Sequence, residues 1–260
     1  MYRDKEASLP PVVGRPRRRR LVSTVLRREY KPDRKKVEQK NRNSYFVIEK
    51  KLYLCGVNLN HQNKDMEALA LDLKKRYTYA DYLAWIDDVR MELIDGFIKL
   101  FPAPVDIHAK VSYRLTRQLG NFIESTNCGC EIRYAPYDVR LPENGETAND
   151  KIYTVVQPDI SIICDLSKLD INGCVGAPDM IVEILSSSNR KRDLLEKFYL
   201  YQKSGVREYW IADPKVKTVT VYIMQQDGEY DDGEVYQMGE KVPVHIFNGH
   251  LIDMNDIFAF

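Results

Sequence analysis

Long apolar runs are missing from this 260-residue chain. No segment approaches the roughly eighteen consecutive apolar residues that a membrane-spanning helix needs. The N-terminus also lacks the apolar core of a secretory signal peptide. These absences argue against an integral membrane protein and against an exported one. The expectation is a cytoplasmic protein without a membrane partner.

Cysteine is scarce as well, with five residues: Cys55, Cys128, Cys130, Cys164 and Cys174. No pair has the C-x-x-C spacing, and Cys128-Gly129-Cys130 alone makes a poor zinc site because the other two ligands are missing. The odd number and the absence of an export signal predict five reduced thiols, which agrees with a cytoplasmic location.

Charge is unevenly distributed along the chain, although the net charge is only +1. Residues 1–65 hold 18 basic and 7 acidic residues, a net charge of +11, with a block of four arginines at 17–20. Residues 66–260 hold the other 21 basic and 31 acidic residues, a net charge of −10. We therefore divide the chain into a basic extension, 1–65, and a globular domain, 66–260.

The extension has three interpretations that the sequence leaves open. A nucleic-acid-binding arm would use the arginine block to contact phosphates. A disordered tail without function has the same composition. The third interpretation is an incorrect start codon, because Met66 stands where the globular texture begins.

The globular domain reads as mixed α/β, with 44% hydrophobic residues overall, enough for one medium-sized core. The spacing predicts helices at 79–87, 104–125 and 190–203, the first capped by Thr78 and the last ended by Gly205. In the long helix, Val105, His108 and Phe122 are among the expected packing positions. Strands are expected at 91–100 around an Asp-Gly turn, and at 131–141, 157–164, 179–186, 206–212 and 216–224, followed by a β-rich tail.

Three acidic residues stand in apolar segments that read as strands. Glu183 lies within MIVEIL, Asp159 precedes the apolar run of QPDISIIC, and Glu92 lies in MELIDGFI. For any one of them, a side chain that points to solvent is the commonest explanation. Three together favour carboxylates that converge at strand ends, the usual oxygen cage for Mg²⁺ or Mn²⁺. Such an ion would compensate the burial of Glu183.

A site of this kind also requires a positively charged side chain near Glu183. Two positions beyond Glu183, where a lysine would share its strand face, the residue is Leu185. The following helix supplies Lys197, which stands four positions after Asp193 on the same helix face. Lys197 either forms a solvated pair with Asp193 or lies at the core boundary with its ammonium directed back to the strand.

The order of these residues is similar to the pattern of the PD-(D/E)xK nuclease superfamily. More closely, residues 78–258 resemble the Uma-type putative restriction endonucleases, a bacterial family. The similarity rests on segments in the family's order: YTYADYLAW, MELIDG, YDVRLP, VVQPDISI, GAPDMIVEILS and RDLLEKFYLYQKSGVREYWIADP. A single Pro-Asp carries no weight, but ELIDG, QPD, GAPD-x-x-x-E and GVREYW in series are highly specific.

The resemblance implies a restriction-endonuclease-like fold, a mixed sheet flanked by helices. It implies that Asp159 and Glu183 hold Mg²⁺ or Mn²⁺, that Glu92 is the first acid of the site, and that Lys197 is the lysine moved from the strand to the helix. His108 matches a frequent histidine and is either auxiliary or structural. One departure is Ser186-Ser187-Ser188-Asn189, where the family often has Ser-Pro-Ser-Thr.

A second Pro-Asp, at 178–179, competes for the role of metal ligand. Asp179 would share a strand face with Glu183, but four residues at about 3.3 Å each would separate them by about 13 Å. We therefore prefer Asp159 to Asp179.

The implied activity is metal-dependent hydrolysis of DNA. Arg190, Lys191 and Arg192 are candidates for binding DNA near Lys197, and the net charge of the domain otherwise opposes such binding. The alternative is a non-catalytic protein of the same fold that binds nucleic acid or a partner. Apolar residues of the tail, Val244, Ile246 and Phe247, suggest a homodimer, which would suit cleavage of two strands.

Overall fold

The computed structural model describes residues 72–85, 91–100, 105–186 and 190–260, with only the backbone at 190–193. All of them belong to one compact unit, Asn41–Phe260. The basic extension and its arginine block lie outside the described residues. No helix in the described ranges is both long enough and apolar enough to cross a membrane.

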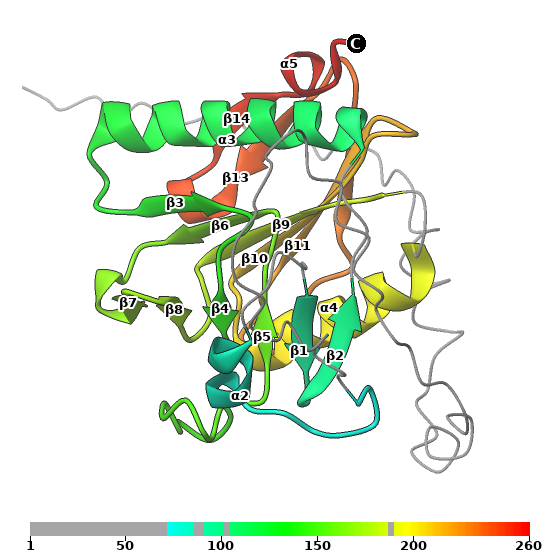
Figure 1. Cartoon of the computed structure of the whole chain (residues 1–260). Helices are drawn as coiled ribbons and strands as arrows, with labels where there is room; N and C mark the ends of the chain where they lie inside the picture. Colours follow the sequence, from blue (N-terminus) through cyan, green and yellow to red (C-terminus); the bar gives the residue numbers. More distant parts are fainter. Residues whose placement is uncertain (1–71, 86–90, 101–104, 187–189) are drawn as a thin grey trace, which may run out of the picture. The chain divides into compact units, whose positions relative to one another are not determined.

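A six-stranded mixed sheet, called the central sheet below, forms the middle of the domain (Figure 1). Its strands, in spatial order, are β12 (Glu234–Gln237), β11 (Thr218–Ile223), β10 (Glu208–Asp213), β9 (Met180–Ile184), β6 (Ile160–Ile163) and β3 (Glu131–Tyr134). Only β9 and β10 run parallel among these neighbours. Parallel strands need a crossover connection, and the helix α4 (Arg190–Ser204) provides it.

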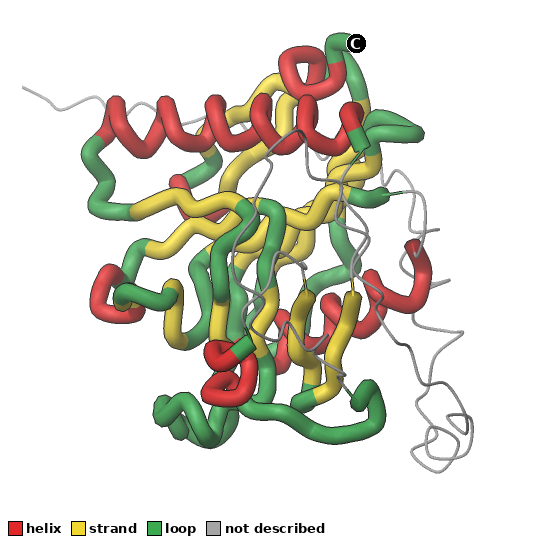
Figure 2. Tube along the Cα trace, in the orientation of Figure 1, coloured by secondary structure: helices red, strands yellow, loops and turns green. Residues whose placement is uncertain are grey.

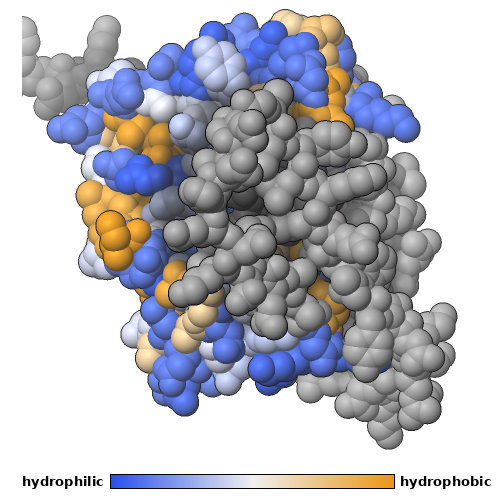
Figure 3. Space-filling model, viewed as in Figure 1, coloured by the Kyte–Doolittle hydropathy of each residue, from blue (hydrophilic) through white to orange (hydrophobic). Residues whose placement is uncertain are grey.

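Helix α3 (Asp106–Thr126) covers one face of the central sheet (Figure 1). Its buried residues recur every three or four positions, as an amphipathic helix requires, and pack on isoleucine and valine side chains of β6 and β9. Val105, an expected packing position, is instead the exposed N-cap residue, because the helix begins at Asp106. The outward side of α3 is hydrophilic (Figure 3).

Helix α4 lies on the opposite face, so the strands separate α3 from α4 (Figure 2). Its Phe198 and Tyr201 pack in a cluster with Ile181 of β9 and Tyr209 of β10. The helix ends before Gly205, which has a φ of +87°. The predicted helix and its glycine stop are confirmed.

A second six-stranded sheet contributes to the same apolar cluster as α4. Its strands, in spatial order, are β2 (Phe97–Leu100), β1 (Met91–Ile94), β5 (Val155–Val156), β4 (Val139–Arg140), β8 (Gly173–Val175) and β7 (Leu169–Asp170). The predicted 91–100 hairpin is confirmed, with its turn at Asp95 and Gly96. The short helix α2 (Tyr79–Ala84) begins at a capping box of Thr78 and Asp81 and ends before the predicted residue 87.

The prediction of one continuous strand over residues 131–141 is wrong. The segment divides into β3 and β4, which belong to different sheets. Pro136 lies between them and has no N–H to donate to a strand ladder, so one strand cannot continue through it.

The C-terminal segment contains more than strands. It forms the hairpin β13 (Lys241–Val244) and β14 (His250–Asp253), with a short 3-10 helix η2 (His245–Phe247) and a helix α5 (Met254–Phe258). Val244 and Phe247 are buried in the cluster that α3 and the central sheet share, and Ile246 packs against it. These apolar residues complete the core, so they no longer support the predicted homodimer.

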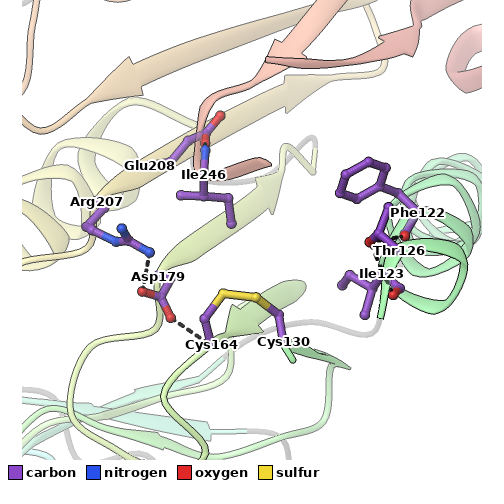
Figure 4. Close-up of a disulfide and its surroundings, with 9 residues drawn as sticks. All are labelled: Phe122, Ile123, Thr126, Cys130, Cys164, Asp179, Arg207, Glu208 and Ile246. Atoms are coloured by element: carbon purple, nitrogen blue, oxygen red, sulfur yellow. Dashed lines mark hydrogen bonds and ion pairs between the residues drawn. A yellow bond between two sulfur atoms is a disulfide. The ribbon is translucent and has the colours of Figure 1, made fainter. Parts of the chain in front are cut away.

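The prediction of five reduced thiols is also wrong. Cys130 and Cys164 form a disulfide (Figure 4). Antiparallel pairing of Glu131 with Ile163 places the two cysteines at the next opposed positions, although 34 residues separate them in sequence. A cytoplasmic location therefore loses the support that thiol chemistry gave it. Cys128 is free and exposed, and Cys174 is free and buried.

Candidate functional site

Two neighbouring strands bring Asp159 and Glu183 together. The strand register pairs Ile160 with Val182 in antiparallel strands, so the preceding Asp159 lies opposite Glu183. Along β9, Val182 faces the core under α3, whereas Ile181 faces the cluster under α4. Side chains alternate along a strand, so Glu183 points to the α4 side of the sheet.

Lys197 of α4 meets Glu183 there. Its Nζ donates to Glu183 Oε1 and to Glu92 Oε1, each at 2.9 Å. The Lys197 and Glu92 side chains are 8% and 3% exposed. Of the two interpretations of Lys197, the structure shows the second, an ammonium at the core boundary that reaches back to the strand.

Glu92 lies on β1 of the second sheet, and its two oxygens differ in their surroundings. Oε1 accepts from Lys197 and from the backbone N–H of Gln157 at 2.8 Å. Oε2 is buried and has no hydrogen-bond partner among the described residues. A buried carboxylate oxygen without a donor is costly, so this atom is a natural ligand for an additional cation.

Asp159 is held from two sides. Its Oδ2 accepts the backbone N–H of Ile184 at 2.7 Å and lies 3.1 Å from Nε2 of His108. His108 is in the first turn of α3 and is buried. The helix on one face of the central sheet therefore orients a carboxylate of the site, and the helix on the other face supplies the ammonium.

Among the residues that the structure describes, the site brings the Lys197 ammonium together with the carboxylates of Glu92, Asp159 and Glu183. Burial raises the pKa of Glu183 to about 7; the Lys197 ammonium opposes this shift, and the charges of Asp159 and Glu92 add to it. Burial alone would lower the pKa of Lys197, but Glu183 and Glu92 more than offset it, so its pKa is raised. Lys197 is therefore charged at neutral pH.

Tyr201 is a further residue of the site, and it was not predicted from the sequence. Its hydroxyl donates to Glu183 Oε1 at 2.6 Å. Burial, with the Glu183 charge, raises the pKa of Tyr201 well above its ordinary value, so the hydroxyl remains a donor. The feature of the sequence that could have identified Tyr201 is its position four residues after Lys197, on the same helix face.

The oxygens of this site fit a hard divalent cation. No group of three or more His, Cys, Asp or Glu forms a ready metal cage within the described ranges. Mg²⁺ does not need one, since it commonly binds one or two carboxylates and keeps waters or substrate oxygens. Among the described residues, the hydrogen bonds of Glu183 fall on its Oε1 and those of Glu92 fall on its Oε1, which leaves the other oxygen of each carboxylate for a cation.

Other candidate residues lie elsewhere. Asp179, at the start of β9, accepts the backbone N–H of Cys164 at 2.6 Å and an N–H of Arg207 at 2.6 Å (Figure 4). Both its oxygens thus have structural partners. Arg190, Lys191 and Arg192 form the first turn of α4, but their side chains lie outside the described residues.

Known proteins are similar to this chain in sequence or in fold. Residues 79–255 match the sequence profile of the Uma2 family, described as "Putative restriction endonuclease". The uncharacterized protein slr1290 of Synechocystis sp. is 26% identical over 153 residues, which cover 58% of this chain and 75% of that protein. The crystal structure of a putative nuclease of DUF820 from Anabaena variabilis superposes with a TM-score of 0.56 at 22% identity, covering 70% of this chain and 98% of that one.

The family match spans more than two thirds of the chain and includes every residue of the site described above. The structural similarity supports the predicted fold class, a nuclease fold with mixed sheets and flanking helices. The resemblance seen in the sequence is thereby confirmed: the chain belongs to the Uma2 family of putative restriction endonucleases.

Proposed function

We propose that this protein is a metal-dependent endonuclease that hydrolyses phosphodiester bonds of DNA. The observation that carries the proposal is the convergence of Glu92, Glu183 and Lys197 from three elements, with Asp159 across the strand from Glu183. Among the described residues, the buried Oε2 of Glu92 has no hydrogen-bond donor, and a divalent cation would supply the positive charge that this atom lacks.

Asp159 and Glu183 would hold Mg²⁺ or Mn²⁺, which supplies Lewis acidity at the scissile phosphate. His108 keeps the Asp159 carboxylate in one orientation, and Tyr201 does the same for Glu183. Glu92 holds the Lys197 ammonium through Oε1, and its Oε2 would bind a further cation. Lys197, charged and fixed, offsets negative charge that develops on the phosphate during hydrolysis.

Duplex DNA as the substrate has to be reconciled with the net charge of −10 on residues 66–260. Such a domain repels polyphosphates unless cations gather near the site. The basic extension, with a net charge of +11, and the basic start of α4 are two parts of the chain that could supply them.

The test is cleavage of supercoiled plasmid by the purified full chain, with Mg²⁺, with Mn²⁺ and with EDTA. We expect nicked or linear products only with a divalent ion. The Glu183→Gln variant keeps the shape of the side chain and removes the charge, so it should be folded and inactive. Circular dichroism of the variant provides the check on folding.

Two outcomes would count against the proposal. Equal cleavage in EDTA would remove the metal from the mechanism. Tight DNA binding without cleavage under any metal would favour the non-catalytic alternative.

A further inference from the structure

A second lysine–glutamate pair lies beside the catalytic one. Lys99 of β2 donates from Nζ to both carboxylate oxygens of Glu196 on α4, each at 2.9 Å. Glu196 immediately precedes Lys197 in the helix. Two ion pairs therefore join the β1–β2 hairpin to α4. In one pair the hairpin supplies the acid, Glu92, and the helix supplies Lys197. In the other the hairpin supplies the base, Lys99, and the helix supplies Glu196.

Strand register places Lys99 at the site. Glu92 and Lys99 are directly opposed in the β1–β2 hairpin, so their side chains project from the same face of the second sheet. Opposed residues in antiparallel strands have Cβ atoms about 5 Å apart. The stem of Lys99 therefore lies next to the carboxylate that holds Lys197.

The two pairs differ in their exposure to water. The Glu92–Lys197 pair is almost fully buried, whereas the side chains of Lys99 and Glu196 are 29% and 33% exposed. An ion pair exposed to this extent contributes little to stability, because solvent screens it and its side chains lose entropy. Lys99 can therefore exchange its carboxylate for another anion at little cost.

We propose that Lys99 is a substrate-binding residue that takes up a phosphate of the nucleic-acid backbone next to the one that is cleaved. In the free protein, the Glu196 carboxylate occupies the place of that phosphate. Both anions present two oxygens to one ammonium, and a phosphodiester oxygen is an equivalent acceptor for Lys99 Nζ. This inference rests on the proposed function and adds a substrate contact to it.

Lys197 cannot serve the same purpose. Its ammonium already donates to two buried carboxylates. Moving it to a flanking phosphate would leave the buried carboxylates of Glu92 and Glu183 without this cation, which is strongly unfavourable. Lys99, in contrast, would give up only its contact with Glu196, whose side chain is one-third exposed.

The experiment measures binding of the full chain to a fluorescent DNA duplex by anisotropy, from about 50 to about 200 mM NaCl. All variants carry Asp159→Asn, so that the duplex stays intact. Lys99→Met should weaken binding roughly five-fold and reduce the slope of log Kd against log salt by about 0.9. Glu196→Gln should have the opposite effect and tighten binding.

The matched control is the pair Lys203–Glu143, an exposed ion pair that also anchors α4 but lies at its last turn. Lys203→Met and Glu143→Gln should leave Kd and slope unchanged. A double-mutant cycle sharpens the result, because Glu196→Gln should no longer tighten binding once Lys99 is methionine.

The outcomes separate this inference from the proposed function. If the otherwise wild-type chain cleaves DNA but Lys99→Met binds with wild-type affinity and slope, the inference is wrong and the proposed function stands. Equal losses of thermal stability in Lys99→Met and Glu196→Gln, with no change in Kd, would show a structural pair only. A chain that neither binds nor cleaves DNA would contradict both the inference and the proposed function.

Discussion

At the residue scale, Glu183 is the centre of the site. It stands in a strand whose other side chains are apolar, and its carboxylate meets a lysine and a tyrosine from one helix. The sequence could identify Glu183, Asp159 and Glu92 as unusual, because charged residues rarely occupy buried strand positions. It could not show that Lys197 bridges two of them, since that contact depends on how β1 and α4 pack.

The pKa of Glu183 leads to a prediction about stability. Burial raises this pKa to about 7, above the ordinary value of 4.5. The folded protein then binds a proton that the unfolded chain releases, so the stabilisation is present below pH 4.5 and is lost as the pH rises through about 7. In EDTA, the free energy of unfolding should fall by at most about 3 kcal/mol over this range.

Urea unfolding at a series of pH values measures this effect, with Glu183→Gln as the comparison. The variant should lack this part of the pH dependence. Addition of Mg²⁺ should stabilise the wild-type protein more at pH 8 than at pH 6, because a bound cation favours the ionised carboxylate. The same pH dependence in both proteins would contradict the assignment.

His108 gives a second prediction at this scale. If it orients Asp159, then His108→Gln should raise the Mg²⁺ concentration for half-maximal cleavage by about 10- to 100-fold, as loss of a partner behind a metal ligand does. High Mg²⁺ should restore much of the activity. The control is His245→Gln at an exposed position. Activity that Mg²⁺ cannot restore would indicate a purely structural histidine.

At the scale of elements, helix ends and tight turns were predicted correctly, because the residues at those positions determine them. The helix cap at Thr78, the turn at Asp95-Gly96 and the stop at Gly205 were all predicted and are present. Pairing between distant segments was not predictable. The division of 131–141 between two sheets and the Cys130–Cys164 disulfide both follow from strand order, which a single sequence does not reveal.

Glu208 of β10 shows how a buried charge can serve the fold alone. Its carboxylate accepts three N–H groups, from Trp210 Nε1 at 2.7 Å, from the backbone of His245 at 3.1 Å and from that of Ile246 at 2.8 Å. The contacts tie η2, between β13 and β14, to the central sheet. A buried acid is therefore not by itself a sign of catalysis.

Glu208→Gln should lower the free energy of unfolding by about 2 to 3 kcal/mol. Glutamine has one acceptor oxygen, so its amide group would face a backbone donor and leave a buried polar group unsatisfied. Guanidinium unfolding followed by tryptophan fluorescence measures the loss. The exposed Glu229→Gln should change stability by less than about 0.5 kcal/mol. Similar effects of the two substitutions would refute the bonding role.

At the scale of the whole molecule, residues 1–65 carry a net positive charge and residues 66–260 a net negative charge. If the extension contributes to DNA binding, replacing the block Arg17–Arg20 by serine in the full chain should weaken binding. The slope of log Kd against log salt should fall by up to about 0.9 for each arginine that contacts a phosphate. An unchanged slope would instead support a chain whose functional part begins near Met66.

The fold class and the family were predictable at this scale because several short motifs recur in one order over 180 or so residues, and the matched profile covers 79–255. The chemistry of the site follows less directly. Motif order places Pro-Asp twice, at 158–159 and 178–179, and only the three-dimensional contacts distinguish Asp159 beside Glu183 from Asp179 beside Cys164 and Arg207.

These two Pro-Asp residues provide the most direct test of the central claim. The measurement is the rate of plasmid cleavage in Mg²⁺ by the full chain carrying Asp159→Asn or Asp179→Asn. Loss of a metal ligand should lower the rate of Asp159→Asn by at least about a hundred-fold. Asp179→Asn, which keeps an acceptor oxygen for its backbone partner, should cleave at close to the wild-type rate. Full activity of Asp159→Asn would contradict the assignment of this site.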